Sequence, residues 1–186
     1  MRKTLTVLAV LALSVGLAQE LLVNGDFEQP LATGWTHTDS GYGTHQSDRA
    51  IDYHPDPDYE AMTYQYDNPG WSRLSQTVVT PGIQLSLSFW AKFEEAGGVS
   101  TCWPAACFSV RYLDGAGTAL GETRWYYSTY ANWVPSPTLS LHRITAPDWA
   151  EYSLDVAQEI TANLPGVNPG DVAQLEVALF SYTYDG

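Results

Sequence analysis

The sequence predicts an all-β fold, a two-layer antiparallel β-sandwich, on three observations. Residues 83–93 carry an apolar side chain at every second position, which is the period of a half-buried β-strand. Several other short alternating segments are separated by Gly, Pro, Asp and Asn turns, as in two-layer β domains. Aromatic residues make up 13% of the chain and charged residues only 16%, which is typical of β-rich extracellular domains.

The individual strands follow from the same alternation. Residues 107–113 form the next alternating segment, the turn 114–117 follows, and residues 118–127 can return as a strand. Together with residues 83–93, they predict a three-stranded meander. Further strands are expected over residues 60–66, 74–79, 152–156 and 171–184, and one short helix over residues 157–164.

The N-terminus has the three parts of a secretory signal. Arg2 and Lys3 are basic, residues 5–17 are almost wholly apolar, and Gly16 and Ala18 place small residues where a signal peptidase inspects the chain. The apolar run is shorter than the roughly 20 residues of a membrane-spanning helix. We expect a signal peptide over residues 1–18 and a single domain over residues 19–186, secreted or extracytoplasmic (periplasm or cell surface), with no membrane span after cleavage. The alternative is an uncleaved anchor.

The charge balance narrows the classes of partner. The chain has 21 acidic and 8 basic residues. Such an acidic surface repels nucleic acid and anionic membranes, so neither is an expected partner. It suits solubility and the binding of cations.

The two cysteines, Cys102 and Cys107, both follow the signal segment. In an oxidising compartment, the pair predicts a disulfide that pins the tip of a hairpin. The alternative is two free thiols in a reducing compartment. A metal site would need further Cys or His residues nearby, and the sequence has none there.

Three segments resemble carbohydrate-binding modules of the family 4/9/22 type, which are galactose-binding-like jelly rolls. They are Leu-Val-Asn-Gly-Asp-Phe-Glu at residues 22–28 with Gly34-Trp35, Leu-Ser-Leu-Ser-Phe-Trp-Ala-Lys at residues 85–92, and Asp-Trp-Ala-Glu-Tyr-Ser-Leu at residues 148–154. The resemblance implies a jelly-roll sandwich whose partner is a carbohydrate or a cell-surface polymer. Members usually end on a closing strand, whereas this chain stops at residues 184–186. We therefore expect either a fragment or a sandwich with an open edge, lacking its last strand.

The resemblance also implies a structural calcium ion at the opening turn. It nominates Asn24, Asp26 and Glu28 as ligands, with Asp48 or Asp52 supplying the other half of the site. Hard oxygen ligands at a tight turn suit calcium. The alternative is a solvated turn in which Asn24 and Asp26 bond their own backbone.

Aromatic side chains are the candidates for sugar recognition, because the C–H face of a sugar ring packs on a flat ring and nearby polar groups bind the hydroxyls. The alternative is that these rings fill the core. Neighbouring residues of a strand face opposite ways, so at least one ring of residues 125–127 should be exposed. The candidate ligand-binding residues are Trp71, Arg73, Gln76, Arg124, Trp125, Tyr127, Tyr130, Asn132 and Trp133.

No catalytic residue is predicted. Glu94 and Glu95 are adjacent and would face apart on a strand, and Asp56 and Asp58 lie in a proline-rich loop. The four histidines stand apart, and nucleophile-elbow and nucleotide-binding motifs are lacking. The sequence thus predicts a secreted, non-catalytic carbohydrate-binding module. The alternatives are a structural or adhesion module of the cell envelope without a sugar site, and a small jelly-roll glycosidase or lyase.

Overall fold

The structure, a computed structural model, describes residues 20–41, 43–51, 58–66, 68–95, 97–99, 101–131 and 133–185. The predicted signal peptide lies outside these residues. No helix in the described ranges combines the length and the apolar character needed to cross a membrane.

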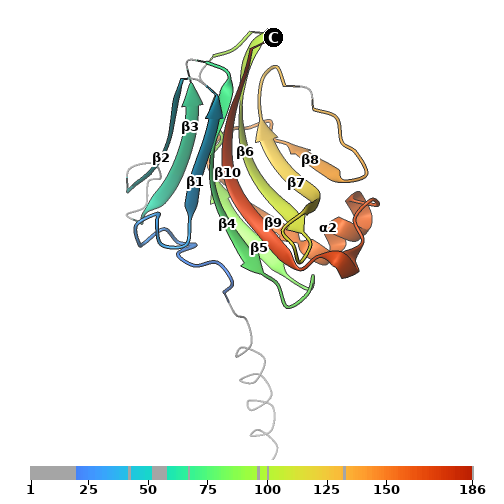
Figure 1. The fold of residues 1–186 in the computed structure, drawn as a ribbon. Coiled ribbons are helices and arrows are strands. Elements are labelled where there is room, and N and C mark those ends of the chain that lie inside the picture. The colour runs from blue at the N-terminus through green and yellow to red at the C-terminus, as the bar shows by residue number, and fades with distance from the viewer. Residues whose placement is uncertain are drawn as a thin grey trace, which may run out of the picture.

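The elements alternate with short turns along the chain (Figure 1). In order they are β1 (Thr36–Gly41), β2 (Thr44–Ala50), β3 (Glu60–Tyr66), β4 (Gly70–Val79), β5 (Ser86–Ala91), β6 (Cys102–Leu113), β7 (Ala119–Tyr127), β8 (Leu139–Arg143), β9 (Ala150–Asp155), α2 (Val156–Asn163), the 3-10 turn η1 (Pro169–Asp171) and β10 (Gln174–Asp185). The predicted helix is present, and Asp155 begins it by accepting a hydrogen bond from Gln158 N at 2.9 Å.

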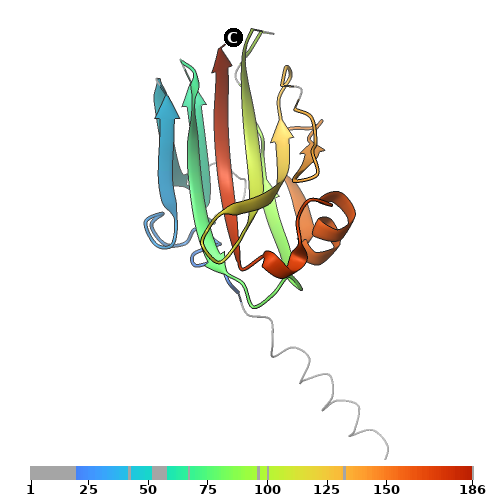
Figure 2. The ribbon, with the colours of Figure 1, turned by 45° about the vertical axis from the view of Figure 1, so that its right-hand side comes forward.

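One six-stranded sheet, in the order β1-β4-β10-β6-β7-β8, forms the main layer. All its pairs are antiparallel except β7 with β8. Figure 2 shows the last strand, β10, between β4 and β6. The open edge predicted at the end of the chain is therefore wrong, because β10 is hydrogen bonded along both sides. The edges of the main sheet are β1 and β8 instead.

Two smaller two-stranded sheets, β2–β3 and β5–β9, lie on one face of the main sheet. The Phe89 ring of β5 stacks on Phe108 of β6 with centroids 3.6 Å apart, and the Thr63 hydroxyl of β3 hydrogen bonds to Ser72 of β4 at 2.8 Å. The main core lies between these layers and includes Leu74, Val110 and Tyr112. The prediction of an all-β, two-layer jelly-roll sandwich is confirmed, with strands far apart in the sequence side by side in one sheet.

The predicted meander is only half correct. The β6–β7 hairpin forms around the turn 114–117, with Asp114 Oδ1 accepting from Thr118 N at 2.8 Å. Strand β5, in contrast, pairs with β9 in the other layer. Alternation shows that residues 83–93 form a strand with one apolar face, but it does not identify the partner.

The predicted disulfide is wrong. Both cysteines are free thiols on the single continuous strand β6, so no hairpin tip lies between them. Five residues of strand separate their Cα atoms by roughly 16 Å and turn their side chains to opposite faces. A disulfide requires Cα atoms within about 7 Å. Burial raises the pKa of the Cys107 thiol to about 12, which makes it unreactive in the folded state.

Thiol labelling tests this arrangement. We expect one equivalent of an alkylating reagent to label exposed Cys102 in the folded protein, and a second to label Cys107 only after unfolding in denaturant without reductant. Intact-mass measurement reports both steps. A protein that takes up no label in denaturant until it is reduced would contradict the structure.

Candidate functional site

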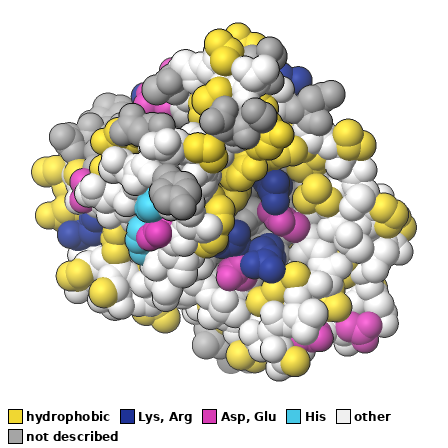
Figure 3. Space-filling model, turned by 45° about the horizontal axis from the view of Figure 1, so that its top comes forward, with side chains coloured by type: hydrophobic (Ala, Val, Ile, Leu, Met, Phe, Trp, Pro, Cys, Tyr) yellow, Lys and Arg dark blue, Asp and Glu magenta, His cyan; other side chains and the backbone are white. Residues whose placement is uncertain are grey.

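The face of the main sheet opposite the two small sheets is here called the open face. In the described part of the chain, no helix or strand is packed over it. Side chains alternate along each strand, so Trp71 and Arg73 of β4, Arg111 of β6 and Glu176 of β10 all point to this face. They line a cleft of about 670 Å³. Figure 3 shows basic and acidic side chains gathered in a hollow, with hydrophobic side chains beside them.

A row of small residues crosses three strands of the open face. Ala178 of β10 lies opposite Ser75 of β4 on one side and Ser109 of β6 on the other. The same row continues to Arg124 of β7, which is the partner of Ser109. Of this row, Ser75 lines the cleft, while Ala178 and Ser109 are buried.

Ion pairs hold the charged side chains of this face. Glu176 Oε1 accepts hydrogen bonds from Arg73 Nη2 and, at 3.0 Å, from Arg111 Nη1. Arg124 Nε donates to Glu122 Oε1 at 2.7 Å. The Arg73 and Glu176 side chains are only 15% and 17% exposed. Burial lowers the pKa of Arg73, which Glu176 opposes and the nearby Arg111 charge reinforces.

Aromatic rings form one wall of the open face. Trp71 lies 6.3 Å from Phe180, which lies 6.1 Å from Tyr182. Trp133, in the loop after β7, packs 5.0 Å from Tyr126 and receives the Arg124 guanidinium 4.6 Å above its ring. The cleft therefore combines flat apolar rings with a dense set of hydrogen-bonding groups.

The predicted binding residues divide between the two faces. Trp71, Arg73, Arg124 and Trp133 come together on the open face, as the register and ring contacts place them. Tyr130 lies in the loop after β7 and is 43% exposed. Asn132 lies outside the described residues.

Two of the predicted binding residues, Trp125 and Tyr127, lie on the packed face and do not line the cleft, whereas the third, Gln76, does line it. Trp125 is only 5% exposed, and its ring stacks 4.9 Å from His142 in the core, so it cannot stack on a sugar. Tyr127 is half-buried against the same core. The Gln76 amide bonds both Val23 N (2.7 Å) and Val23 O (2.8 Å), which fixes the N-terminal segment to β4.

Sequence reasoning missed Glu122, Arg111 and Glu176, which carry the charge of the cleft with Arg73 and Arg124. It also missed Phe180, which adjoins Trp71. Arg111 and Glu176 alternate with apolar residues on their own strands, but the pairing of β10 between β4 and β6 decides that they meet. The signal available in the sequence was the charged side chain inside an otherwise apolar strand.

The opening turn binds a side-chain cation. Arg49 of β2 donates from Nε to Phe27 O and from Nη2 to Glu28 O at 2.8 Å, while its guanidinium lies 3.3 Å from the Tyr59 ring centroid. The Glu28 carboxylate accepts from Tyr59 N at 3.0 Å. These contacts use the backbone carbonyls and the carboxylate that the resemblance assigns to calcium.

The side chains of the other predicted ligands accept hydrogen bonds from nearby backbone N–H groups. This agrees with the alternative, in which the residues of the turn bond their own backbone. Asn24 Oδ1 accepts from Gln29 N at 2.7 Å, Asp26 Oδ1 from Glu28 N at 3.3 Å, and Asp48 Oδ1 from Arg49 N at 2.8 Å. Asp52 lies outside the described residues. Within the described ranges, no three His, Cys, Asp or Glu side chains gather in a metal-binding arrangement. Calcium at this turn stays a prediction, and the hydrogen bonds of the described residues favour the alternative.

Thermal unfolding distinguishes a turn held by Arg49 from a turn that binds calcium. We expect Arg49→Gln to cost about 1.5 kcal/mol, because two carbonyls lose a charged donor. A chelator should leave the melting temperature of the unmodified protein unchanged. Arg143→Gln is the control, since exposed Arg143 donates one hydrogen bond among the described residues, at 3.3 Å to Ser128 O. A melting temperature that falls on chelation and recovers with calcium would instead support the calcium prediction.

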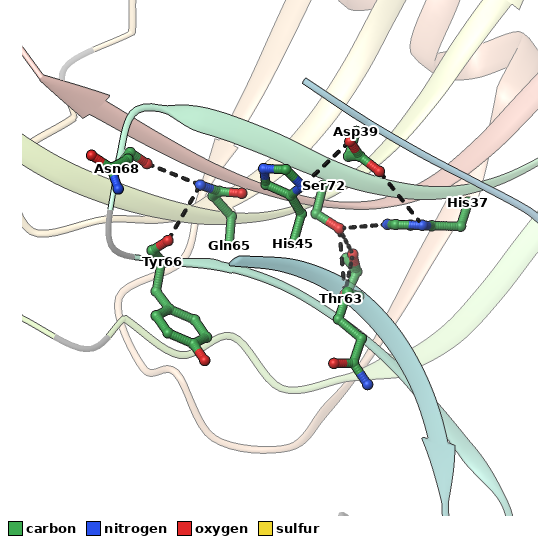
Figure 4. Close-up of polar contacts among 9 residues, drawn as sticks. His37, Asp39, His45, Thr63, Gln65, Tyr66, Asn68 and Ser72 are labelled. Carbon is green, nitrogen blue, oxygen red and sulfur yellow. Dashed lines mark hydrogen bonds and ion pairs between the residues drawn. The ribbon is translucent and has the colours of Figure 1, made fainter. Parts of the chain in front are cut away.

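A polar cluster between the layers has an order similar to a Ser-His-Asp triad (Figure 4). His37 Nε2 lies 3.0 Å from Ser72 Oγ, and His37 Nδ1 lies 3.9 Å from Asp39 Oδ2. Ser72 is 0% exposed, however, and its hydroxyl also meets the Thr63 hydroxyl and Gln46 O. A nucleophile must reach its substrate, so this cluster serves to attach β2–β3 to the main sheet.

Solved structures resemble this chain only at low sequence identity. The enzymatically active domain of tailspike protein 4 from bacteriophage CBA120 matches 89% of the chain at 17% identity with a TM-score of 0.52, and the chain spans 20% of that protein. The family 11 carbohydrate-binding module of the cellulase Lic26A-Cel5E from Clostridium thermocellum matches 90% of the chain and 92% of the module at 13% identity with a TM-score of 0.40.

A second structure of the family 11 module from Clostridium thermocellum, in complex with a β-1,3-1,4-mixed-linked tetrasaccharide, covers 86% of the chain and 89% of the module at 12% identity with a TM-score of 0.39. No protein-family model matches the chain, and no curated protein matches it. At these identities the likeness concerns the fold alone. The resemblance to the family 4/9/22 type stays a prediction.

Proposed function

We propose that the cleft on the open face binds carbohydrate and that the chain is a secreted, non-catalytic binding module. The observation that carries the proposal is the cleft itself, in which the half-buried rings of Trp71 and Phe180 adjoin the charged donors and acceptors of Arg73 and Glu176. A sugar needs both kinds of group at once, an apolar surface for its C–H face and polar groups for its hydroxyls.

The proposal gives each group of the cleft a part in binding. The Trp71 ring, beside Phe180, offers the stacking surface at one end of the cleft. Arg73 and Arg111 offer N–H donors to hydroxyl oxygens, and Glu176 offers an acceptor held in place by both arginines. Because these side chains already bond one another, little conformational entropy is lost when a sugar binds.

The alternative function for the cleft is glycoside hydrolysis by a pair of carboxylates. Glu122 and Glu176 are the register partners of Arg111 on its two sides, which places their Cα atoms about 10 Å apart across the strands. A glycosidase needs one of its two carboxyl groups to donate a proton. Here each carboxylate is held by a hydrogen bond from an arginine, an arrangement that suits binding better than acid catalysis.

A glycan array tests the proposal. We expect the unmodified protein to bind at least one class of glycan, and Trp71→Ala to weaken that binding about tenfold through loss of ring stacking. Trp90→Ala is the matched control, because this exposed tryptophan alternates with Phe89 and so points away from the main sheet. Binding to no glycan would favour the adhesion module. Release of shortened or unsaturated products would favour the glycosidase or lyase.

A further inference from the structure

Positive charge is concentrated in the cleft of a strongly acidic chain. The chain has 21 acidic and 8 basic residues, yet Arg73 of β4 and Arg111 of β6 line the cleft, and Arg124 of β7 lies beside it, 5.9 Å from the Phe180 ring. The carboxylates that pair with them are Glu176 and Glu122. Three guanidinium groups therefore face two carboxylates, and the cleft is net positive on a net negative molecule.

Within the described part of the chain, most N–H groups of these arginines have no hydrogen-bond acceptor. A guanidinium group has five N–H donors, whereas each of the three uses a single nitrogen on its glutamate. Arg73 Nε is buried and has no hydrogen-bond partner among the described residues. An unused buried donor costs free energy unless a ligand accepts from it.

Small side chains lie between the arginines on the same face of the sheet. Ser75, Ala178 and Ser109 form the row of small side chains between the arginines. The Ser109 hydroxyl is also buried and has no partner in the described ranges. A group that enters the cleft would meet the guanidinium of Arg73, which lines it.

We infer that the cleft takes an acidic glycan, whose sugar units carry carboxylates, in preference to a neutral one. The inference rests on the proposed carbohydrate-binding function and names the class of sugar. A planar carboxylate matches the planar fork of arginine and can accept two parallel hydrogen bonds from it. The added negative charge balances the third guanidinium, and the ring of the sugar stacks on Trp71 as before.

The experiment compares matched pairs of ligands. Short oligosaccharides of galacturonate, glucuronate, mannuronate and guluronate are each titrated beside their carboxyl-reduced, neutral forms at low and high salt. We expect at least one uronate to bind about tenfold more tightly than its neutral counterpart, as a charge-assisted hydrogen bond allows. High salt should weaken the binding of the uronate but not of the neutral form.

Two variants locate the effect. Arg111→Gln should remove about tenfold of the affinity for the uronate, because Arg111 is the most exposed of the three arginines that bind the two glutamates. Arg143→Gln, outside the cleft, should change it less than twofold, and circular dichroism verifies that both variants fold. Equal binding of both forms, or binding of neutral glycans alone, would overturn the acidic class while keeping the sugar site. Binding of no glycan on the panel or the array would overturn the proposed function as well.

Discussion

Phe108→Ala should lower the free energy of unfolding by about 3–5 kcal/mol, the range for removing a buried aromatic side chain. Phe108 stands at the contact between the two layers, where it stacks on Phe89 and lies 6.0 Å from the Trp125 ring. Its loss opens a cavity beneath β5 and removes contacts to both layers. Denaturant titration gives the free energy directly.

Two further variants make that result interpretable. Phe108→Leu keeps most of the volume and should cost less than about 1.5 kcal/mol, so it reports on packing even if the alanine variant does not fold. Val79→Ala removes an exposed side chain of β4 and should stay within about 0.5 kcal/mol of the unmodified protein. A loss under about 1 kcal/mol for Phe108→Ala would mean that β5–β9 does not pack on the main sheet there.

Glu176→Ala should cost about 2–3 kcal/mol, because it leaves Arg73 and Arg111 without their shared carboxylate. The figure lies below that of a fully buried pair because these side chains keep some contact with solvent. Removing one partner of a buried pair costs more than removing both, since the remaining charge stays desolvated.

The double variant Arg73→Met with Glu176→Met isolates that effect. Two apolar side chains of similar volume should recover most of the stability lost in Glu176→Ala, as measured by denaturant titration. If Glu176→Ala is as stable as the unmodified protein, the ion pairs over the cleft do not form in solution, and the electrostatic description of the cleft is wrong.

Local pattern was sufficient to predict most strands. The segments 60–66, 107–113 and 118–127 alternate because one face of each is buried, and all three lie in strands of the structure. Pairing was not predictable, because alternation says nothing about the partner. Strand β5 is the example, since it pairs with β9 across about sixty residues rather than with its neighbour β6.

Because alternation does not identify the partner strand, only some of the predicted binding residues lie at the cleft. Trp71 and Trp125 both occur in alternating strands, but only the sheet assembly decides that Trp71 faces the cleft and Trp125 the core. The contacts of Glu176 with Arg73 and Arg111 span 103 and 65 residues of sequence. Contacts at that separation depend on the register of β10 between β4 and β6, which no local pattern contains.

The central claim is that glycan binds on the open face, and nuclear magnetic resonance tests it most directly. A bound oligosaccharide should shift the backbone amide signals of β4, β10 and β6 around Trp71, Arg111 and Ser109. The signals of β2, β3, β5 and β9, which lie against the opposite face, should stay in place. Shifts confined to those four strands, with β4, β10 and β6 unchanged on binding, would contradict the account.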